Sequence, residues 1–146
     1  MLNIQDDIIS YREMCDNESV QTLQRGMNFR LNPRYSVILM SQRPNAPYKD
    51  KIYEDGITIE YEGHNASRMG YNHFPKFEDQ PEKLPSGKLT QNGLFIKAVN
   101  NFKNGGKPEL VKVYEKIIDG VWSLKGIFEL KDYKVVHDGK RNVFRF

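Results

Sequence analysis

Residues 108–146 read PELVKVYEKIIDGVWSLKGIFELKDYKVVHDGKRNVFRF. Apolar and β-branched residues alternate with polar ones through this stretch, and two Asp-Gly pairs, Asp119-Gly120 and Asp138-Gly139, interrupt the alternation. An Asp-Gly pair between alternating runs is typical of a two-residue β-hairpin turn. The stretch therefore predicts strands at 108–117, 121–136 and 141–146, joined by tight turns.

Two segments upstream predict further strands. Residues 35–40, YSVILM, form a continuous apolar run, which is typical of a buried central strand. Residues 52–63, IYEDGITIEYEG, contain an Asp55-Gly56 turn followed by alternating apolar and polar residues up to Tyr61. We expect this second segment to form a hairpin.

Helical spacing occurs at the N-terminus and in the middle of the chain. Residues 4–15 place apolar side chains at helical intervals, so we expect a short amphipathic helix there and a further helical turn around 20–23. Thr90 is a suitable N-cap for a second helix that Gly105-Gly106 would end. Residues 64–88 lie between the strands and this helix and show no clear periodicity, and a loop of that length is usually functional or disordered.

Composition bounds the class of protein. The 146 residues suit one domain, and no run approaches the roughly 18 apolar residues of a membrane-spanning helix. Acidic residues occupy the N-terminus, MLNIQDDIIS, where a secretory signal needs basic and then apolar ones, so we expect a cytoplasmic protein with no membrane partner. The net charge of +3 permits nucleic-acid binding without requiring it.

Residues with catalytic potential form no recognised constellation. His64, His73 and Asp79 could in principle hold a metal, but their spacing matches no standard site. Cys15, the single cysteine, lies on the apolar side of the first predicted helix, which favours an inert buried thiol over a Cys–His dyad. We therefore expect no cofactor, no metal and no catalysis within this chain, and a binding module rather than an enzyme.

Four segments, in order, resemble the SRA (SET- and RING-associated) domain, a reader of modified cytosine in DNA. RYSVILM at 34–40 is similar to the "AYS" strand of that family, and YKDKIYEDGITIEYEG at 48–63 to its hairpin ending in Tyr-x-Gly. Asp79-Gln80 with LTQNGLFIKAVN at 89–100 resembles its helix. GKPELVKVYEKIIDGVW at 106–122 resembles its "GKP…YDG" strands.

The resemblance covers about residues 27–146 and implies an α+β fold, a PUA-like bent β-barrel with flanking helices. It implies two parts, an N-terminal helical segment at 1–26 and an SRA-like DNA-binding domain at 27–146. It is most similar to bacterial modules placed ahead of an HNH nuclease. The implied function is the specificity domain of a modification-dependent restriction endonuclease, whose nuclease module would follow residue 146.

Members of that family flip 5-methylcytosine or 5-hydroxymethylcytosine out of double-stranded DNA into a pocket. By resemblance, Tyr48 and Tyr61 would stack on the base, Asp50 would accept its amino hydrogens, and Glu62 and Gly63 would border the pocket. Tyr53 and Asp55 are rival assignments, because the spacing between the two tyrosines is one residue longer than usual. Asp55 also suits a turn, and Tyr61 also suits the core.

The loop after Gly63 occupies the place where family members carry a finger that fills the vacated hole. Met69 and Tyr71, beside Arg68, could act as a wedge. Basic residues that could hold phosphates flank the proposed pocket in the sequence: Arg30, Arg34, Arg43, Lys49, Lys51 and Arg68. An RNA-binding module and a protein-interaction domain with exposed aromatic residues remain alternatives, since PUA-like barrels also bind RNA.

Overall fold

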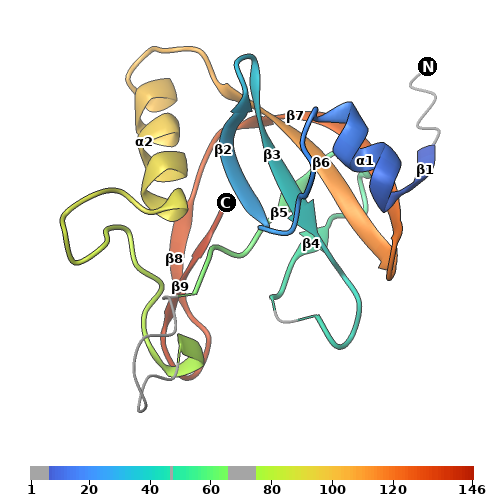
Figure 1. Ribbon diagram of the computed structural model, residues 1–146. Coiled ribbons are helices and arrows are strands. Elements are labelled where there is room, and N and C mark those ends of the chain that lie inside the picture. The colour runs from blue at the N-terminus through green and yellow to red at the C-terminus, as the bar shows by residue number, and fades with distance from the viewer. Residues whose placement is uncertain (1–6, 47, 66–74) are drawn as a thin grey trace.

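A five-stranded sheet forms the centre of the computed structural model, which describes residues 7–46, 48–65 and 75–146 (Figure 1). The strand order is β1-β7-β6-β3-β2, and only β3 and β6 run parallel. The bounds are β1 (Asp7–Ser10), β2 (Met27–Asn32), β3 (Tyr35–Met40), β6 (Glu109–Ile118) and β7 (Val121–Leu130). The two long strands β6 and β7 pair through the predicted Asp119-Gly120 turn.

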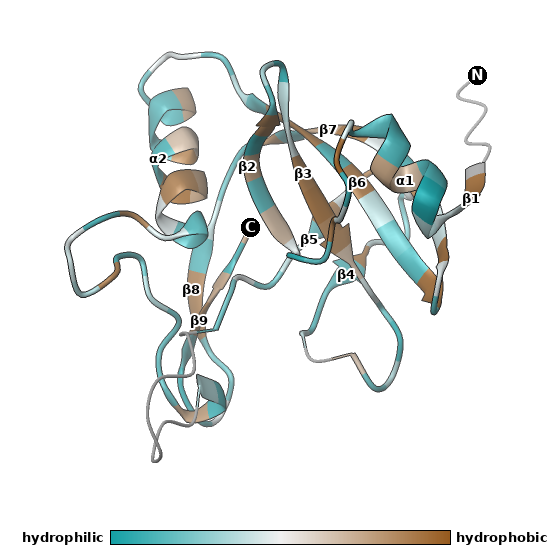
Figure 2. Cartoon of the chain, in the orientation of Figure 1, coloured by the Kyte–Doolittle hydropathy of each residue, from teal (hydrophilic) through white to brown (hydrophobic). Residues whose placement is uncertain are grey.

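Each face of this sheet packs on one helix, because successive side chains of a strand point to opposite faces. Ile38 and Met40 of β3 belong to the core cluster that contains Phe95 of α2 (Gln91–Lys103). Val37 and Leu39 alternate with them and join a second cluster, which contains Met14 and Cys15 of α1 (Tyr11–Asn17). Accordingly, Figure 1 shows α1 and α2 on opposite sides of the sheet, and β3 is among the most hydrophobic segments in Figure 2. The apolar run of β3 is therefore buried on both faces.

Capping residues set where both helices begin. The Thr90 side chain accepts a hydrogen bond from the N–H of Gly93, as the sequence predicts for an N-cap. Ser10 caps α1 through a reciprocal capping box with Glu13. The two helices thus start at signals that are local in the sequence.

Shorter strands extend the structure away from the central sheet. β4 (Lys51–Ile52) pairs with β5 (Ile59–Glu60), and β8 (Lys134–His137) pairs with β9 (Asn142–Arg145). Backbone hydrogen bonds run in both directions between Tyr61 and Phe146, and Gly63 N–H donates to Phe144 O at 2.9 Å, so β5 continues into a pairing with β9. A 3-10 turn, η1 (Pro75–Phe77), precedes Gln80. The end of β5 is consequently fixed by the C-terminal hairpin.

The α+β prediction with helices flanking a strand-rich domain is confirmed. β1 and β2 are the outer strands of the central sheet, so within the described residues this sheet does not close into a barrel. No helix in the described part of the chain combines the length and apolar character needed to cross a bilayer.

Three local predictions are wrong. The helix expected at 4–15 begins only at Tyr11, because residues 7–10 pair with β7 instead. Residues 20–23 form no helical turn; there Leu23 N–H donates to the Tyr11 hydroxyl at 2.9 Å. The strand expected at 121–136 is two strands, which are separated where the Asp132 carboxylate accepts the N–H of Tyr133 at 2.8 Å.

Candidate nucleic-acid interface

The predicted pocket residues come together where the loop after β3 passes the end of β5. The Asp50 carboxylate accepts one hydrogen bond from the N–H of Ser41 and one from the N–H of Glu62, each at 3.1 Å. In return, the Glu62 carboxylate accepts the N–H of Lys49 at 3.2 Å. These reciprocal bonds join residues 48–50 to residues 61–63, so the two segments form one site.

Burial dominates the electrostatics of Asp50. Removal from water raises the pKa of its carboxyl from 3.8 to about 6, and the nearby Glu62 carboxylate adds to the rise. The backbone donors of Ser41 and Glu62, with Arg145 nearby, favour the charged form but do not cancel the effect of burial. Asp50 is therefore an ionised acceptor at neutral pH that takes up a proton under mildly acidic conditions.

The two tyrosines differ in accessibility. The ring of Tyr48 is half-buried, and its hydroxyl bonds to the backbone of Asn65. Tyr61 is only 3% exposed and packs in the same core cluster as Met27 and Phe95. Burial, together with the charge of Asp50, raises the pKa of Tyr61 well above 10. Tyr61 is thus a core residue whose hydroxyl end lies toward the site.

Glu62 lies at the centre of a buried ionic network. Its side chain is within 3.7 Å of guanidinium nitrogens of both Arg141 and Arg145, which come from the C-terminal hairpin. Glu62 and Arg141 are 4% and 5% exposed. Arg145 also donates to Glu60 at 2.9 Å and to the carbonyl of Lys49. The positions of Glu62 and of the loop at 48–50 therefore depend on the last strand of the chain.

Two buried amide side chains take the place of a neighbouring strand beside residues 63–64. Gln80 donates to Gly63 O at 2.7 Å and accepts the N–H of Phe144 at 2.8 Å. Asn92 accepts the N–H of His64 at 2.8 Å and donates to His64 O at 3.0 Å. A Cβ on Gly63 would lie 2.6 Å from the Asn92 side-chain oxygen, so only glycine leaves room for both amides. Gln80 and Asn92 lie in the segments that resemble the SRA helix, but the sequence did not predict that they contribute to the site.

His64 is a third residue of the site, besides Gln80 and Asn92, that the sequence did not assign to the pocket. Its Nε2 accepts the N–H of Met27 at 3.2 Å, and its ring meets the ring of Tyr48 edge to face, with centroids 6.5 Å apart. Burial and the nearby Arg25 lower the pKa of His64, so the imidazole is neutral at pH 7. Next to Met27, a Cβ on Gly26 would lie 2.3 Å from the Tyr61 hydroxyl, so the start of β2 forms the other wall.

No family model and no curated protein sequence matches this chain, but solved structures do. The SRA domain of SUVH5 in complex with hemi-methylated CG DNA superposes with a TM-score of 0.62, at 18% identity over 97% of this chain and 83% of that chain. The SUVH5 SRA domain bound to fully hydroxymethylated CG DNA gives 0.62, at 17% identity over 97% and 84%. KRYPTONITE in complex with mCHH DNA, an H3(1–15) peptide and SAH gives 0.59, at 15% identity over 96% and 30%.

The chain adopts the SRA fold. The fold that the order of motifs in the sequence implied is therefore confirmed. The two ends of the segment at 48–63 meet in this fold, because the N–H of Glu62, within Tyr61–Gly63, donates to the carboxylate of Asp50.

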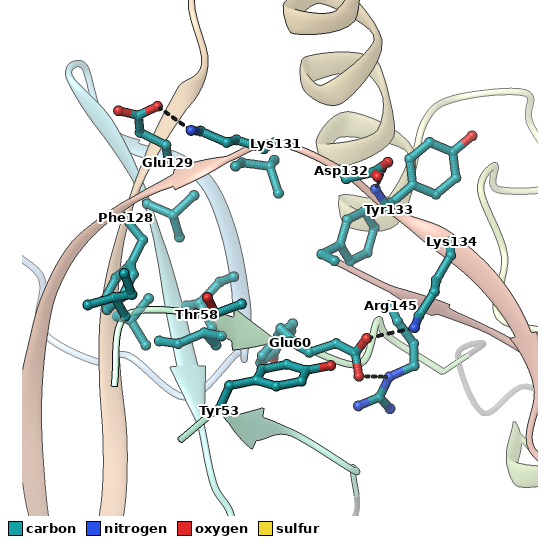
Figure 3. Close-up of a pocket in the computed structure, with 18 residues that line it drawn as sticks. Tyr53, Thr58, Glu60, Phe128, Glu129, Lys131, Asp132, Tyr133, Lys134 and Arg145 are labelled. Carbon is teal, nitrogen blue, oxygen red and sulfur yellow. Dashed lines mark hydrogen bonds and ion pairs between the residues drawn. The ribbon is translucent and has the colours of Figure 1, made fainter. Parts of the chain in front are cut away.

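The rival residues Tyr53 and Asp55 lie elsewhere in the SRA fold. Asp55 is exposed and caps its own turn, accepting the N–H groups of Ile57 and Thr58 at 2.9 and 2.8 Å. Tyr53 lines a groove of about 580 Å³ between the β4–β5 hairpin and the end of β7 (Figure 3). Ion pairs of Glu60 with Lys134 and with Arg145 occupy one end of that groove. Asp50 is bonded to the backbone of Glu62, whereas Tyr53 shares its groove with Tyr61.

Two predicted phosphate contacts do not flank the pocket. Arg34 lies in the β2–β3 turn and Arg30 is bound to Glu109 at 2.7 Å, both at the end of β3 opposite to Ser41. The six residues of β3 span about 20 Å at the usual rise of a strand. Neighbours in the sequence on either side of a strand lie at its two ends, so Arg30 and Arg34 are distant from the pocket. Arg43, Lys49 and Lys51 are exposed on the segment that carries Tyr48.

Some predicted residues lie outside the described part of the chain, namely Arg68, Met69, Tyr71 and His73. Of the remaining metal candidates, His64 uses Nε2 to hold Met27, and Asp79 accepts the N–H of Asn142 at 2.7 Å. Among the described residues, no group of three or more His, Cys, Asp or Glu side chains could hold a metal ion. Cys15, a residue of α1, is fully buried.

Proposed function

We propose that this chain binds double-stranded DNA and recognises a modified cytosine, 5-methylcytosine or 5-hydroxymethylcytosine, by base flipping. The supporting observation is that residues 48–50 lie against residues 61–63. This arrangement places the half-buried ring of Tyr48 near the carboxylate of Asp50, which is ionised at neutral pH. The solved SRA structures with the same fold hold methylated or hydroxymethylated DNA. We propose the same class of ligand for this chain.

Each residue then has a chemical role in the proposal. Extruding a base costs a few kcal/mol of stacking and pairing, and stacking on an aromatic ring returns about 1–3 kcal/mol per ring. Tyr48 supplies the accessible ring, and the Asp50 carboxylate accepts the amino hydrogens of cytosine. Tyr61 is 3% exposed, so stacking on its ring requires the residues that cover it to move as the base enters. Glu62 and Gly63 border the pocket.

The test is fluorescence anisotropy at one salt concentration, with identical duplexes that carry cytosine, 5-methylcytosine or 5-hydroxymethylcytosine at one position. We expect tighter binding to a modified duplex. Tyr48→Ala should weaken that binding about tenfold or more, the worth of one stacked base. Tyr53→Ala, at the matched tyrosine of the groove between the β4–β5 hairpin and β7, should leave binding unchanged. Equal affinity for all three duplexes would contradict the proposal. An RNA duplex that competes as well as the modified DNA duplex would also contradict it.

We further propose that the chain is the specificity domain of a modification-dependent restriction endonuclease, with the HNH nuclease elsewhere in the parent protein. The motif resemblance to bacterial SRA-like modules supports this role, and the chain supplies binding without catalysis. Incubation with modified plasmid and Mg²⁺ should give a complex and no nicked product. Nicking by the purified chain that scales with its concentration would contradict this division of labour.

A further inference from the structure

His64 is held in place from three directions. Asn92, which is fully buried, bonds to both the N–H and the carbonyl of His64. The imidazole Nε2 accepts the N–H of Met27 at 3.2 Å. The ring stands at 84° to the ring of Tyr48. Neither the backbone nor the side chain of His64 can rotate without breaking one of these contacts.

The bond to Met27 determines which nitrogen carries the proton. A backbone N–H only donates, so Nε2 must be the unprotonated, accepting nitrogen. The neutral imidazole then carries its hydrogen on Nδ1. No described residue accepts that hydrogen in a hydrogen bond. The fold therefore presents one fixed N–H donor whose bonding capacity the described residues leave unused.

The location of this donor suggests its use. The rings of His64 and Tyr48 stand at 84° with their centroids 6.5 Å apart, so a base that binds at the Tyr48 ring lies near the imidazole. A base in that position would be held by Asp50 at its donor edge, because a carboxylate only accepts. The acceptor atoms of the base, and an oxygen on a 5-substituent, would still need a donor. His64 offers a rigid one close to the same ring.

We propose that His64 is a further recognition residue, donating its Nδ1 hydrogen to an acceptor atom of the flipped cytosine. This inference rests on the proposed function, since it names the partner of one more group at the same site. The acceptor is either a ring acceptor, O2 or N3, or the oxygen of a 5-hydroxymethyl group. Asn92 and Met27 are positioning residues for this contact, because they fix the imidazole without facing the base.

Two substitutions separate the donor from the structural bond. His64→Gln can place an amide oxygen where Nε2 lies, so it keeps an acceptor for Met27 and removes the Nδ1 donor. His64→Asn can place an amide N–H where Nδ1 lies, so it keeps the donor and gives up the bond to Met27. We expect His64→Gln to bind modified duplex roughly threefold to tenfold more weakly, as for one neutral hydrogen bond, and His64→Asn to lose less, because it keeps the donor but not the bond that positions it.

The two modified duplexes identify the acceptor. A loss in His64→Gln that is confined to 5-hydroxymethylcytosine places the bond on the substituent, and an equal loss for both modified bases places it on the ring. Wild-type affinity in His64→Gln, or equal losses in the two variants, would overturn the donor role. If wild type itself does not discriminate modified from unmodified duplex, the proposed function has failed rather than this inference alone.

A measurement on the unaltered chain makes the test independent of folding in the variants. In the ¹⁵N spectrum of the histidine rings, we expect His64 to show a protonated Nδ1 and an unprotonated Nε2. Addition of modified duplex should shift the Nδ1 signal of His64, and unmodified duplex should not. An Nδ1 signal that is unchanged at saturating modified duplex would overturn the proposal.

Discussion

Asp50 combines two opposing effects in one carboxyl group. Two backbone N–H donors hold it at the site, while burial raises its pKa from 3.8 to about 6. A carboxyl that binds protons more readily when folded than when unfolded favours the folded state as pH falls through this range. The group therefore costs stability above pH 6, and this cost is relieved between pH 6 and pH 4.

The direction of this pH dependence gives the first prediction. The free energy of unfolding of wild type should rise relative to that of Asp50→Asn as pH falls from 7 to 4, by about 3 kcal/mol at most. Urea unfolding of both proteins across this range measures it, and taking the difference between them removes the contributions of the other carboxyl groups. A difference that stays flat, or that changes in the opposite direction, would show that Asp50 is not destabilised by burial.

Gly63 gives the second prediction, because it leaves room for two side-chain amides. A Cβ there would come within 2.6 Å of Asn92 and 2.9 Å of Gln80, and both side chains are held by other bonds. Gly63→Ala should lower the free energy of unfolding by about 1–3 kcal/mol, the usual cost of overpacking, and should weaken binding of modified duplex. The comparison is Gly87→Ala, at an exposed turn with a φ of +88°, which should cost stability but leave DNA binding unchanged.

At the scale of elements, the sequence predicted those features that depend on nearby residues. The Asp119-Gly120 turn, the Thr90 cap and the apolar run at 35–40 all lie as expected. The N-terminal helix was misplaced because the helical spacing across 4–15 hid a local signal, Ser10 followed by Glu13, which is the capping box that starts α1. Residues before it instead pair with β7, a partner distant in the sequence that periodicity cannot reveal.

In the candidate site, too, contacts between residues near in the sequence were predictable and contacts between distant residues were not. Tyr48, Asp50 and Tyr61 lie within one motif, and their convergence was predictable from the resemblance. The groups that hold them come from elsewhere: Arg145 from β9, Asn92 from α2 and Met27 from β2. No periodic pattern connects these residues with the pocket, because they reach it through the packing of separate elements.

The start of β2 supplies a third prediction, which concerns phosphate contacts. Arg25 is exposed beside Gly26 and lies near enough to His64 to lower the pKa of that imidazole, whereas Arg34 lies at the far end of the hairpin. Arg25→Gln should weaken binding to modified and unmodified duplex alike, and should reduce the salt dependence by about one ion. Arg34→Gln is the matched control and should change neither. The reverse order of effects would place the DNA at the other end of β3.

At the scale of the whole molecule, a buried carboxylate connects the N-terminal segment to the sheet. The Glu18 side chain is inaccessible to solvent; it accepts the hydroxyl of Tyr35 at 3.0 Å, pairs with Lys112 at 3.0 Å and also accepts the Tyr114 hydroxyl. Met14 fills the same side of the sheet. These contacts predict that the segment at 1–26 and the domain at 27–146 unfold together, although the sequence suggested two parts.

Cys15 makes this fourth prediction measurable without any label or deletion, because it is the single cysteine and is fully buried in α1. Under native conditions, the free energy of opening from thiol-reagent kinetics should equal the free energy of unfolding of the sheet measured by circular dichroism. Glu18→Ala should lower both values together, by about 3 kcal/mol, because it leaves the half-buried Lys112 and the hydroxyls of Tyr35 and Tyr114 without their partner. A markedly smaller opening energy at Cys15 would instead show that the N-terminal segment detaches on its own, and the pocket would then depend only on residues 27–146.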